Sequence, residues 1–425
     1  MKIKSSIFFG VVSALTIMTA CSPNNKAGES KKSEGKISGE ISYGIWDKKQ
    51  QPYIDACIAE FNKLYPDVKI TVEVTPFADY WMKLETAATS GTAADVFWMN
   101  GPNITKYAKG GVIAPIDDLL KNSDVDLANY SKALVSLYNI DNKQYAIPKD
   151  FDTIGVWYNK ELFDQAGVPY PTNDWTWEDM VAIAKQLTKS DKSSYGIAAQ
   201  YRDHTGIYNT IYANSGYVIS EDKKTSGYDK PETQAGIQCW VDLQEAGVSP
   251  SEASLEETED YVQFLSGNIA MHWDGSWFLN QVLESDLKDK IGVVELPSIN
   301  GKKATVIHGL GNCISSKTKN PEAAWKWVEF LASKKASEFS AIKGAAIPAY
   351  NGTAQLWVDS HKEYDLGGFI KAVDYSYMYP ASLNTSEWIQ YQSDNFKKAF
   401  SLETSVKDAA DNLAKQMNEV LKNEN

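Results

Sequence analysis

Residues 41–74, ISYGIWDKKQQPYIDACIAEFNKLYPDVKITVEV, combine two β-strand patterns with a helix pattern between them. Apolar side chains alternate with small or polar ones over 41–45 and again over 68–74, the period-two spacing of a strand with one buried face. Between these runs Ile54, Ile58 and Phe61 recur at helical spacing, and Pro66 predicts the end of that helix. The segment therefore predicts a strand, a helix and a second strand in succession.

The alternation of strand and helix continues beyond this segment. A second helix is predicted over about 79–89, and residues 95–99 have the continuous apolar character of a short buried strand. A β-α-β-α-β order implies right-handed crossovers and a mostly parallel sheet, so the predicted fold class is α/β. Ligands bind such sheets outside the carboxyl ends of the strands. Trp46-Asp47 and Met99-Asn100 follow two of these strands and are candidates for a binding site.

Length and composition restrict the class of protein. A chain of 425 residues with 43% hydrophobic and 23% charged residues is typical of a folded protein of two or three domains. Its net charge of −13 gives an acidic surface that repels phosphate backbones, so nucleic acid is not expected as a partner. The 13 Trp, 23 Tyr and 14 Phe are an unusually large aromatic content, and some of these rings are expected to line a site.

The first twenty residues are predicted to be an export signal. Lys2 and Lys4 precede an apolar run over 7–20 that is too short to span a bilayer. The run ends in Met18-Thr-Ala-Cys21, which resembles a bacterial lipobox, and Cys21 would accept the lipid; the alternative is an ordinary signal with a chance cysteine. Residues 1–20 are thus predicted to be a lipoprotein signal peptide and 21–37 a flexible tether. The protein would be anchored to the outer face of the cell membrane through its lipid alone.

Motifs of common catalytic sites do not appear in the sequence. It contains no G-x-S-x-G, no P-loop and no H-E-x-x-H. The four histidines are far apart in sequence, and we interpret them as solvated or structurally bonded: His204, His272, His308 and His361. Tyr375, Tyr377 and Tyr379 alternate as one packed face would, which is favoured over a ferric site. Cys57, Cys239 and Cys313 show no zinc spacing; one disulfide among them stays open, and no redox role is assigned.

Several clusters pair an aromatic ring with a polar side chain. A pyranose ring has an apolar face that stacks on an aromatic plate and an edge of hydroxyls that binds a carboxylate or amide. The alternative is that each Trp packs in a core and each polar group faces water. The clusters are Trp46-Asp47, Tyr80-Trp81, Trp98 with Asn100, Trp273 to Trp277, and Glu387-Trp388. Trp175, Trp177, Trp240, Trp325 and Trp327 are interpreted as packing residues on helices.

Three further segments resemble one family. They are 152–163 (DTIGVWYNKELF), 266–277 (SGNIAMHWDGSW) and 319–331 (KNPEAAWKWVEFL), the last followed by GAAIP at 344–348. Together with the lipobox they resemble the solute-binding lipoproteins of bacterial ABC importers, in the carbohydrate-binding group that includes the maltose-binding protein. Three positions depart from the usual pattern of the first segment: Lys149, Trp157 and Gln165 stand where other residue types are common.

The resemblance implies a two-lobe, type II periplasmic-binding-protein-like fold, each lobe a mostly parallel sheet flanked by helices. Lobe one would comprise 38–149 plus 299–349, and lobe two 150–298 plus 350–425, joined by hinge crossings. It also implies a monomer that is not an enzyme, needs no cofactor or metal, and delivers a sugar or oligosaccharide to separate ABC permease subunits. Ligand would bridge the lobes and stabilise their closure.

Candidate ligand-binding residues are carried over from the family to matching positions of this chain. Trp277 and Trp388 are expected to stack on sugar rings, and Asp47, Asp152 and Asp274 to accept hydrogen bonds from hydroxyls. The complete predicted set is Trp46, Asp47, Tyr80, Trp98, Asn100, Asp152, Tyr208, Asp274, Trp277 and Trp388.

Two alternatives to sugar binding remain. The same fold could bind a polyol, a phosphorylated solute or a metal; the only arginine, Arg202, lies near Tyr208 and offers a single anion contact. An anchored glycoside hydrolase would need two carboxyl groups across the scissile bond. The chain shows no eightfold βα repeat, which argues against that enzyme.

Overall fold

The computed structural model describes residues 37–343 and 346–424, which belong to one compact unit. The predicted signal peptide, Cys21 and all but Ile37 of the predicted tether lie outside these residues. In the part described, no helix is both long enough and apolar enough to cross a bilayer.

The strands are β1 (Gly39–Ile45), β2 (Val68–Val74), β3 (Val96–Asn100), β4 (Asn139–Ile140), β5 (Lys143–Gln144), β6 (Ala146–Asp152), β7 (Ile154–Asn159), β8 (Tyr195–Ile197), β9 (Ile269–Gly275), β10 (Ile291–Glu295), β11 (Thr305–Ile314), β12 (Ile347–Pro348) and β13 (Ser376–Met378). The helices are α1 (Gln51–Leu64), α2 (Phe77–Ser90), α3 (Gly101–Lys109), α4 (Asp117–Leu120), α5 (Lys132–Leu137), α6 (Lys160–Ala166), α7 (Trp177–Leu187), α8 (Tyr208–Ala213), α9 (Pro231–Glu245), α10 (Glu252–Glu257), α11 (Asp260–Leu265), α12 (Leu279–Glu284), α13 (Pro321–Leu331), α14 (Lys334–Ile342), α15 (Ala354–Ser360), α16 (Gly367–Lys371), α17 (Thr385–Phe400) and α18 (Val406–Asn423).

Two sheets organise the fold. The first has the order β12-β6-β11-β3-β1-β2, with β13 paired to β11, and the second has the order β10-β7-β9-β8. The predicted β-α-β-α-β unit is confirmed as β1-α1-β2-α2-β3, in which β1 pairs in parallel with both β2 and β3. The pairs β3–β11, β11–β6, β7–β9 and β7–β10 are antiparallel, so both sheets are mixed rather than mostly parallel. The α/β class is confirmed.

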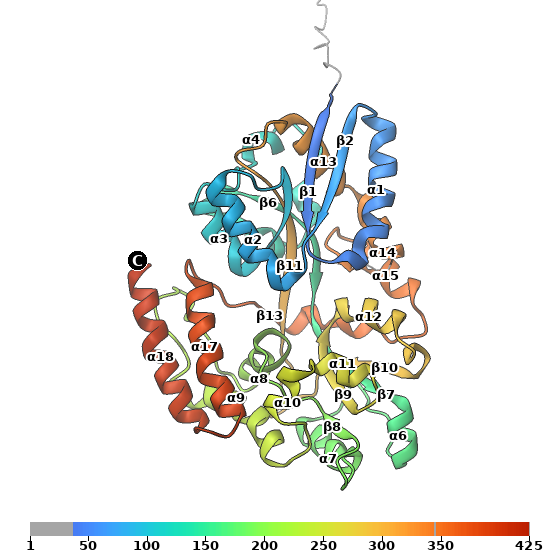
Figure 1. Cartoon of the computed structure of the whole chain (residues 1–425), viewed down its shortest axis with the longest axis vertical. Coiled ribbons are helices and arrows are strands. Elements are labelled where there is room, and N and C mark those ends of the chain that lie inside the picture. The colour runs from blue at the N-terminus through green and yellow to red at the C-terminus, as the bar shows by residue number, and fades with distance from the viewer. Residues whose placement is uncertain (1–36, 344–345, 425) are drawn as a thin grey trace, which may run out of the picture. The chain divides into compact units, whose positions relative to one another are not determined.

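Helices cover both faces of the first sheet (Figure 1). Successive side chains of a strand point to opposite faces, and β3 shows this directly. Val96 and Trp98 pack in the same cluster as Ile54 and other apolar residues of α1. Phe97 and Met99 pack with residues of α2 and α3 in another cluster. Strand β3 is therefore buried on both faces, as its continuous apolar run predicts.

Passage from the first sheet to the second takes a single residue. Strand β6 ends at Asp152 and β7 begins at Ile154, so only Thr153 lies between them. The Thr153 hydroxyl donates a hydrogen bond to the Phe369 carbonyl (2.7 Å), and the Ile154 amide donates to Thr305 Oγ1 (3.0 Å). These bonds satisfy buried polar groups that would otherwise destabilise the crossing. The crossing predicted near 147–151 falls within β6, just before this point, and the lobe boundaries stay a prediction.

Strand β11 runs beside β6 through this crossing, and their pairing contains a bulge. His308 lies opposite Asp152 and Leu310 opposite Asp150, but the next residue, Gly311, lies opposite Pro148. Lys149 is thus the extra residue on β6. A β-bulge of this kind bends the strand and changes the direction of the extra side chain.

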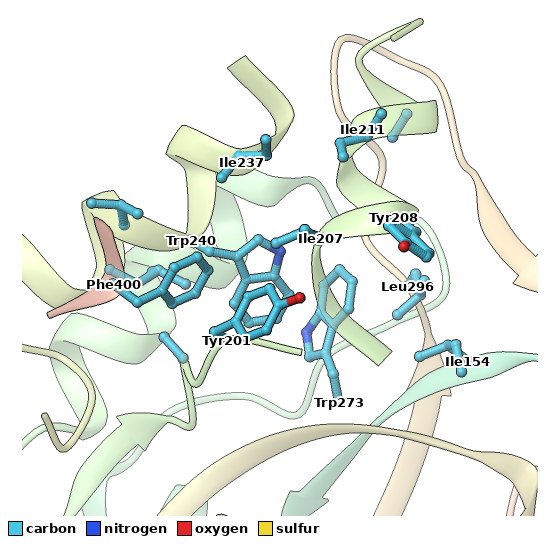
Figure 2. Packing of buried hydrophobic residues seen from close by; sticks show 14 of the residues in the cluster. Ile154, Tyr201, Ile207, Tyr208, Ile211, Ile237, Trp240, Trp273, Leu296 and Phe400 are labelled. Atoms are coloured by element: carbon cyan, nitrogen blue, oxygen red, sulfur yellow. The ribbon is translucent and has the colours of Figure 1, made fainter. Parts of the chain in front are cut away.

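The core of the second sheet is rich in aromatic residues. Figure 2 shows Trp240, Trp273 and Tyr201 packed with aliphatic side chains of α8 and α9. The tryptophans interpreted as packing residues are all buried, although Trp175 lies just before α7 rather than on a helix. The three described cysteines are free thiols; Cys57 and Cys313 are fully buried and Cys239 is partly buried. Burial raises the pKa of the Cys239 thiol to about 11 and that of Cys57 and Cys313 further.

Helix α7 packs directly on β8 at Gly196, where an added Cβ would lie 2.1 Å from the carbonyl oxygen of Ala184. Gly196→Ala should therefore destabilise the fold by about 1–3 kcal/mol, the usual cost of overpacking. Urea unfolding measures this change. Gly367→Ala is the control, because its added Cβ would meet only Asp365 Oδ1 at 3.8 Å; equal stability of the two variants would contradict the close packing.

Candidate functional site

Five aromatic rings gather beside the carboxyl ends of β1 and β3; we call them the aromatic wall. Trp46 follows β1, and its ring centroid lies 5.7 Å from Phe77, 4.9 Å from Tyr80, 5.7 Å from Trp81 and 5.2 Å from Trp98. Trp98 and Tyr80 are buried, and the Tyr80 hydroxyl donates to the Trp98 carbonyl (2.8 Å). Trp46 and Trp81 are partly exposed and Phe77 is 54% exposed. The two buried rings therefore pack beneath the partly exposed ring of Trp46, which contacts the rings of Phe77 and Trp81.

The predicted polar residues beside the wall also shape the backbone. Asp47 caps a 3-10 turn, η1 (Lys48–Gln50); its carboxylate accepts from the Lys49 amide (2.9 Å) and from Gln50 Nε2 (3.3 Å). Asn100 caps α3 by accepting from the Asn103 amide (3.2 Å). Asp47 is partly exposed and retains free lone pairs, whereas Asn100 is buried. Asp47 is thus the better placed of the two for a ligand hydroxyl.

A second group of side chains surrounds Asp152 at the end of β6; we call it the hinge cluster. Asp152 Oδ1 lies 3.3 Å from His204 Nε2, and its Oδ2 lies 3.7 Å from His308 Nδ1. His308 is opposite Asp152 in the β6–β11 register, and His204 comes from a π-helical turn, η3 (Asp203–Ile207). The His204 ring centroid lies 5.3 Å from Trp277 and 5.5 Å from Tyr379. Asp152 and Trp277, both predicted site residues, are therefore linked through His204.

Charge sets the protonation of the hinge cluster. Burial alone would raise the pKa of Asp152, but its contacts with His204 and His308 lower that pKa to about 2. Burial would likewise lower the pKa of His204, yet Asp152, with the charges of Asp203 and Asp274, raises it above the usual value. The structure thus favours a carboxylate paired with an imidazolium.

Asp274 belongs to a chain of charges beside the second sheet. Asp274 Oδ2 lies 3.1 Å from His272 Nε2, and His272 Nδ1 lies 4.0 Å from Asp260. Asp260 in turn binds Arg202, with Nη2 at 3.1 Å and Nε at 3.5 Å from its two oxygens. Although burial would lower the pKa of His272, the two carboxylates raise it. The guanidinium of Arg202 is already held by a carboxylate.

Trp277 lies over Gly275 at the end of β9. A Cβ added to Gly275 would be 1.9 Å from the Trp277 ring, so only glycine permits this approach. Trp277 remains partly exposed.

A hollow of about 440 Å³ opens beside Arg202. It is lined by Gln200, Tyr201, Arg202, Asp203, Leu255, Glu256, Glu259, Ile389, Ser393 and Lys397. The side chain of Arg202 is 42% exposed, and Lys397 pairs with Glu256 at 2.5 Å. Gln200 is buried and its Oε1 has no hydrogen-bond partner. The hollow is therefore polar and retains unused hydrogen-bonding capacity.

Three predicted residues, Trp98, Tyr208 and Trp388, are fully buried and are not available to a ligand in this conformation. Tyr208 is fully buried, and its hydroxyl donates to Gln392 Oε1 (2.9 Å) (Figure 2). Trp388 is also fully buried, and its indole nitrogen donates to Ser382 Oγ (2.9 Å). A side chain without exposed surface cannot stack on a ring, so we correct the prediction and assign all three residues to the core.

Sequence reasoning did not place His204 and His308 in a site, and of the residues that line the hollow it singled out only Arg202. The histidines were interpreted as solvated or structural because nothing in their spacing joins them to Asp152. The available signal was Arg202-Asp203-His204, which places the only arginine beside two other titratable residues. Among the residues described, no group of three or more His, Cys, Asp or Glu is arranged to hold a metal ion.

Comparison with known sequences gives a family match over most of the chain. Residues 46–338 match the family of bacterial extracellular solute-binding proteins. The galactooligosaccharide-binding protein of Bacillus subtilis is 26% identical over 362 residues, covering 83% of this chain and 82% of that protein. The arabinooligosaccharide-binding protein of the same organism is 25% identical over 351 residues, covering 80% and 77%.

Solved structures agree with the fold. An ABC substrate-binding protein of Listeria monocytogenes in complex with cycloalternan superimposes with a TM-score of 0.84 at 26% identity, covering 91% of this chain and 99% of that one. The GacH receptor of Streptomyces glaucescens, studied with acarbose, gives a TM-score of 0.82 at 22% identity, covering 92% and 100%. Because the identity to the GacH receptor is only 22%, its similarity supports the fold and nothing further.

The raised pKa values of His204 and His272 predict a pH dependence of stability. The folded protein binds a proton on each of these histidines more tightly than the unfolded chain does, in which histidines titrate at about pH 6.5. The stabilisation is therefore complete below that pH and is lost as the pH rises through the raised values. Urea unfolding between about pH 6 and pH 9 should show a decline that is smaller in His204→Gln and His272→Gln. His361→Gln, outside both groups, is the control; equal slopes in all variants would refute the assignment.

Proposed function

This chain belongs to the family of bacterial extracellular solute-binding proteins, and we propose that it captures a saccharide between two lobes and delivers it to an ABC importer. The aromatic wall carries this proposal. Trp46, Phe77 and Trp81 expose ring surface, and Asp47, the residue after Trp46, exposes part of its carboxylate; this combination matches the apolar face and hydroxyl edge of a sugar ring. Curated relatives named for oligosaccharides support the same class of ligand.

The second lobe would supply the other half of the site. Trp277 offers a partly exposed ring, and Asp152 and Asp274 offer carboxylates whose orientation is fixed by histidines. Asp203, Gln200 and the exposed part of Arg202 line the adjoining hollow. Ligand that bridges both halves would stabilise the closed arrangement by its differential affinity for that state.

Strand membership supports the predicted lobes, 38–149 plus 299–349 and 150–298 plus 350–425. The first sheet takes β1, β2, β3, β11 and β12 from lobe one, and the second sheet takes β7 to β10 from lobe two. Strand β13 of the predicted lobe two pairs with β11 of the predicted lobe one. Strand β6 runs past the predicted boundary between residues 149 and 150. We propose that closure bends the chain at these crossing strands.

Anchoring and partners complete the proposal. The chain would be cleaved before Cys21, carry lipid on that thiol, and act as a monomer at the outer face of the membrane with separate permease subunits. We propose binding without catalysis. An anionic cargo is less favoured, because Nε and Nη2 of Arg202 already contact Asp260 and the hollow is also lined by Asp203, Glu256 and Glu259.

A thermal-shift screen of the chain from Ile37 tests the function. The panel contains glucose, maltotriose, a galactooligosaccharide, an arabinooligosaccharide, glucose 6-phosphate and inorganic phosphate. A bound sugar at a hundred times its dissociation constant should raise the free energy of unfolding by about 2.7 kcal/mol. Chromatography after long incubation should show the sugar unchanged. Stabilisation by the phosphates alone would favour the non-sugar cargo, and new products would favour the hydrolase.

Substitution of the exposed rings tests the site. Trp46→Ala and Trp277→Ala should each weaken binding of the stabilising sugar by about 1–3 kcal/mol, the scale for losing a buried aromatic contact. Titration calorimetry measures the affinity. Tyr170→Ala removes an exposed ring that bonds to Asp164 on α6 and should leave affinity unchanged. Unchanged affinity in both tryptophan variants would exclude the proposed site.

A further inference from the structure

Lys149 is a buried cation at an irregular point of the fold. It is the extra residue of the β6–β11 bulge, and its side chain is 3% exposed. An ammonium group without water is strongly destabilising unless it is paired and hydrogen-bonded. A lysine at this buried position is therefore tolerated only because its charge is compensated by its surroundings.

The bulge directs the Lys149 side chain into a cage of four partners. Its Nζ is paired with the Asp150 carboxylate and donates to Gln50 Oε1 at 2.9 Å. The same nitrogen lies 4.4 Å from the centroid of the Trp98 ring and 5.8 Å from that of Tyr53, within the range of cation–π attraction. The charge is thus compensated by one ion pair, one hydrogen bond and two aromatic faces.

Two of these partners lead directly to the proposed ligand residues. Gln50 Nε2 donates to Asp47 Oδ2 (3.3 Å), and Gln50 closes the η1 turn that Asp47 caps. Trp98 meets Trp46 edge to face, with centroids 5.2 Å apart and planes at 88°. One ammonium group is therefore connected to the Asp47 carboxylate through Gln50 and to the Trp46 ring through Trp98.

We propose that Lys149 is a positioning residue that fixes Asp47 and Trp46 together in the geometry that binds saccharide. The inference rests on the proposed function. Lys149 itself does not contact ligand; it acts through Gln50 and Trp98. A side chain that is fixed before ligand arrives loses less conformational freedom on binding, so the lysine raises affinity by preorganisation.

The alternative is that Lys149 only stabilises the fold. A single and a double variant distinguish this structural role from the positioning role. Lys149→Met keeps the length of the side chain but leaves Asp150 as an unpaired buried charge, so it should lower stability. Lys149→Met with Asp150→Asn removes both charges, while an asparagine oxygen can still accept from the Leu310 amide, as Asp150 Oδ1 does at 3.1 Å. The double variant should regain stability but not affinity.

Affinity is measured with the sugar of the panel that stabilises the unmodified chain most. Both Lys149 variants should bind it about tenfold more weakly, the scale of one hydrogen bond to a charged group. Lys303→Met is the matched control, because it removes a cation from the buried carboxylate of Glu295, away from the aromatic wall. It should lower stability and leave affinity unchanged. Recovery of both stability and affinity in the double variant would overturn the proposal, as would wild-type affinity in Lys149→Met.

A second readout needs no ligand and therefore separates failure of this inference from failure of the proposed function. In Lys149→Met the amides of Lys49 and Gln50, which bond to Asp47, should exchange hydrogen faster. The Ala128 amide, capped in the same way by Asp126, should keep its rate. Unchanged exchange at Lys49 and Gln50 would overturn the positioning role, whether or not any sugar of the panel binds.

Discussion

The antiparallel pairing of β6 with β11 is the constraint on which the rest of the structure depends. Strand β6 continues into the second sheet after one residue, and the first residue of β11 supplies the hydroxyl that accepts from Ile154. The backbone groups of this crossing are buried, so they must be paired, and a shifted register would leave them unpaired. The same register sets His308 opposite Asp152 and makes Lys149 the unpaired residue of the bulge. One ladder of hydrogen bonds therefore fixes the crossing, the hinge cluster and the buried cation.

Local patterns of the sequence were enough to predict that aromatic rings gather at the ends of β1 and β3. Trp46, Tyr80 and Trp98 meet because parallel strands end at the same edge of a sheet, and that order can be read from periodicity. The antiparallel pairs of β11 were not predicted, because pairing between distant strands leaves no periodic signal in either of them. Trp388 was misjudged for a related reason: an aromatic residue beside an acid looks the same on the buried and the exposed side of a helix.

The second half of the site depends on contacts between residues far apart in sequence. His204 and His308 lie beside Asp152, although neither belongs to a motif that would indicate it; only His272, beside Asp274, lies in a segment that the sequence singles out. The two halves also differ in chemistry. The strand ends of the first sheet carry mainly aromatic rings, whereas the residues around the second sheet are mainly charged side chains fixed by ion pairs. Apolar surface tolerates many ring orientations, whereas fixed hydrogen-bonding groups do not, so selectivity between similar ligands would reside mainly in the second lobe.

The three described cysteines give the fold a further property. Each is a free thiol whose thiolate form is suppressed by burial, so none is an efficient nucleophile while its surroundings stay closed. Acquisition of the native state by this part of the chain consequently does not wait for oxidative pairing. Cys57 on α1, Cys239 on α9 and Cys313 on β11 lie in different regions of the core. The alkylation rate of each thiol would therefore measure how often its own region opens by local unfolding.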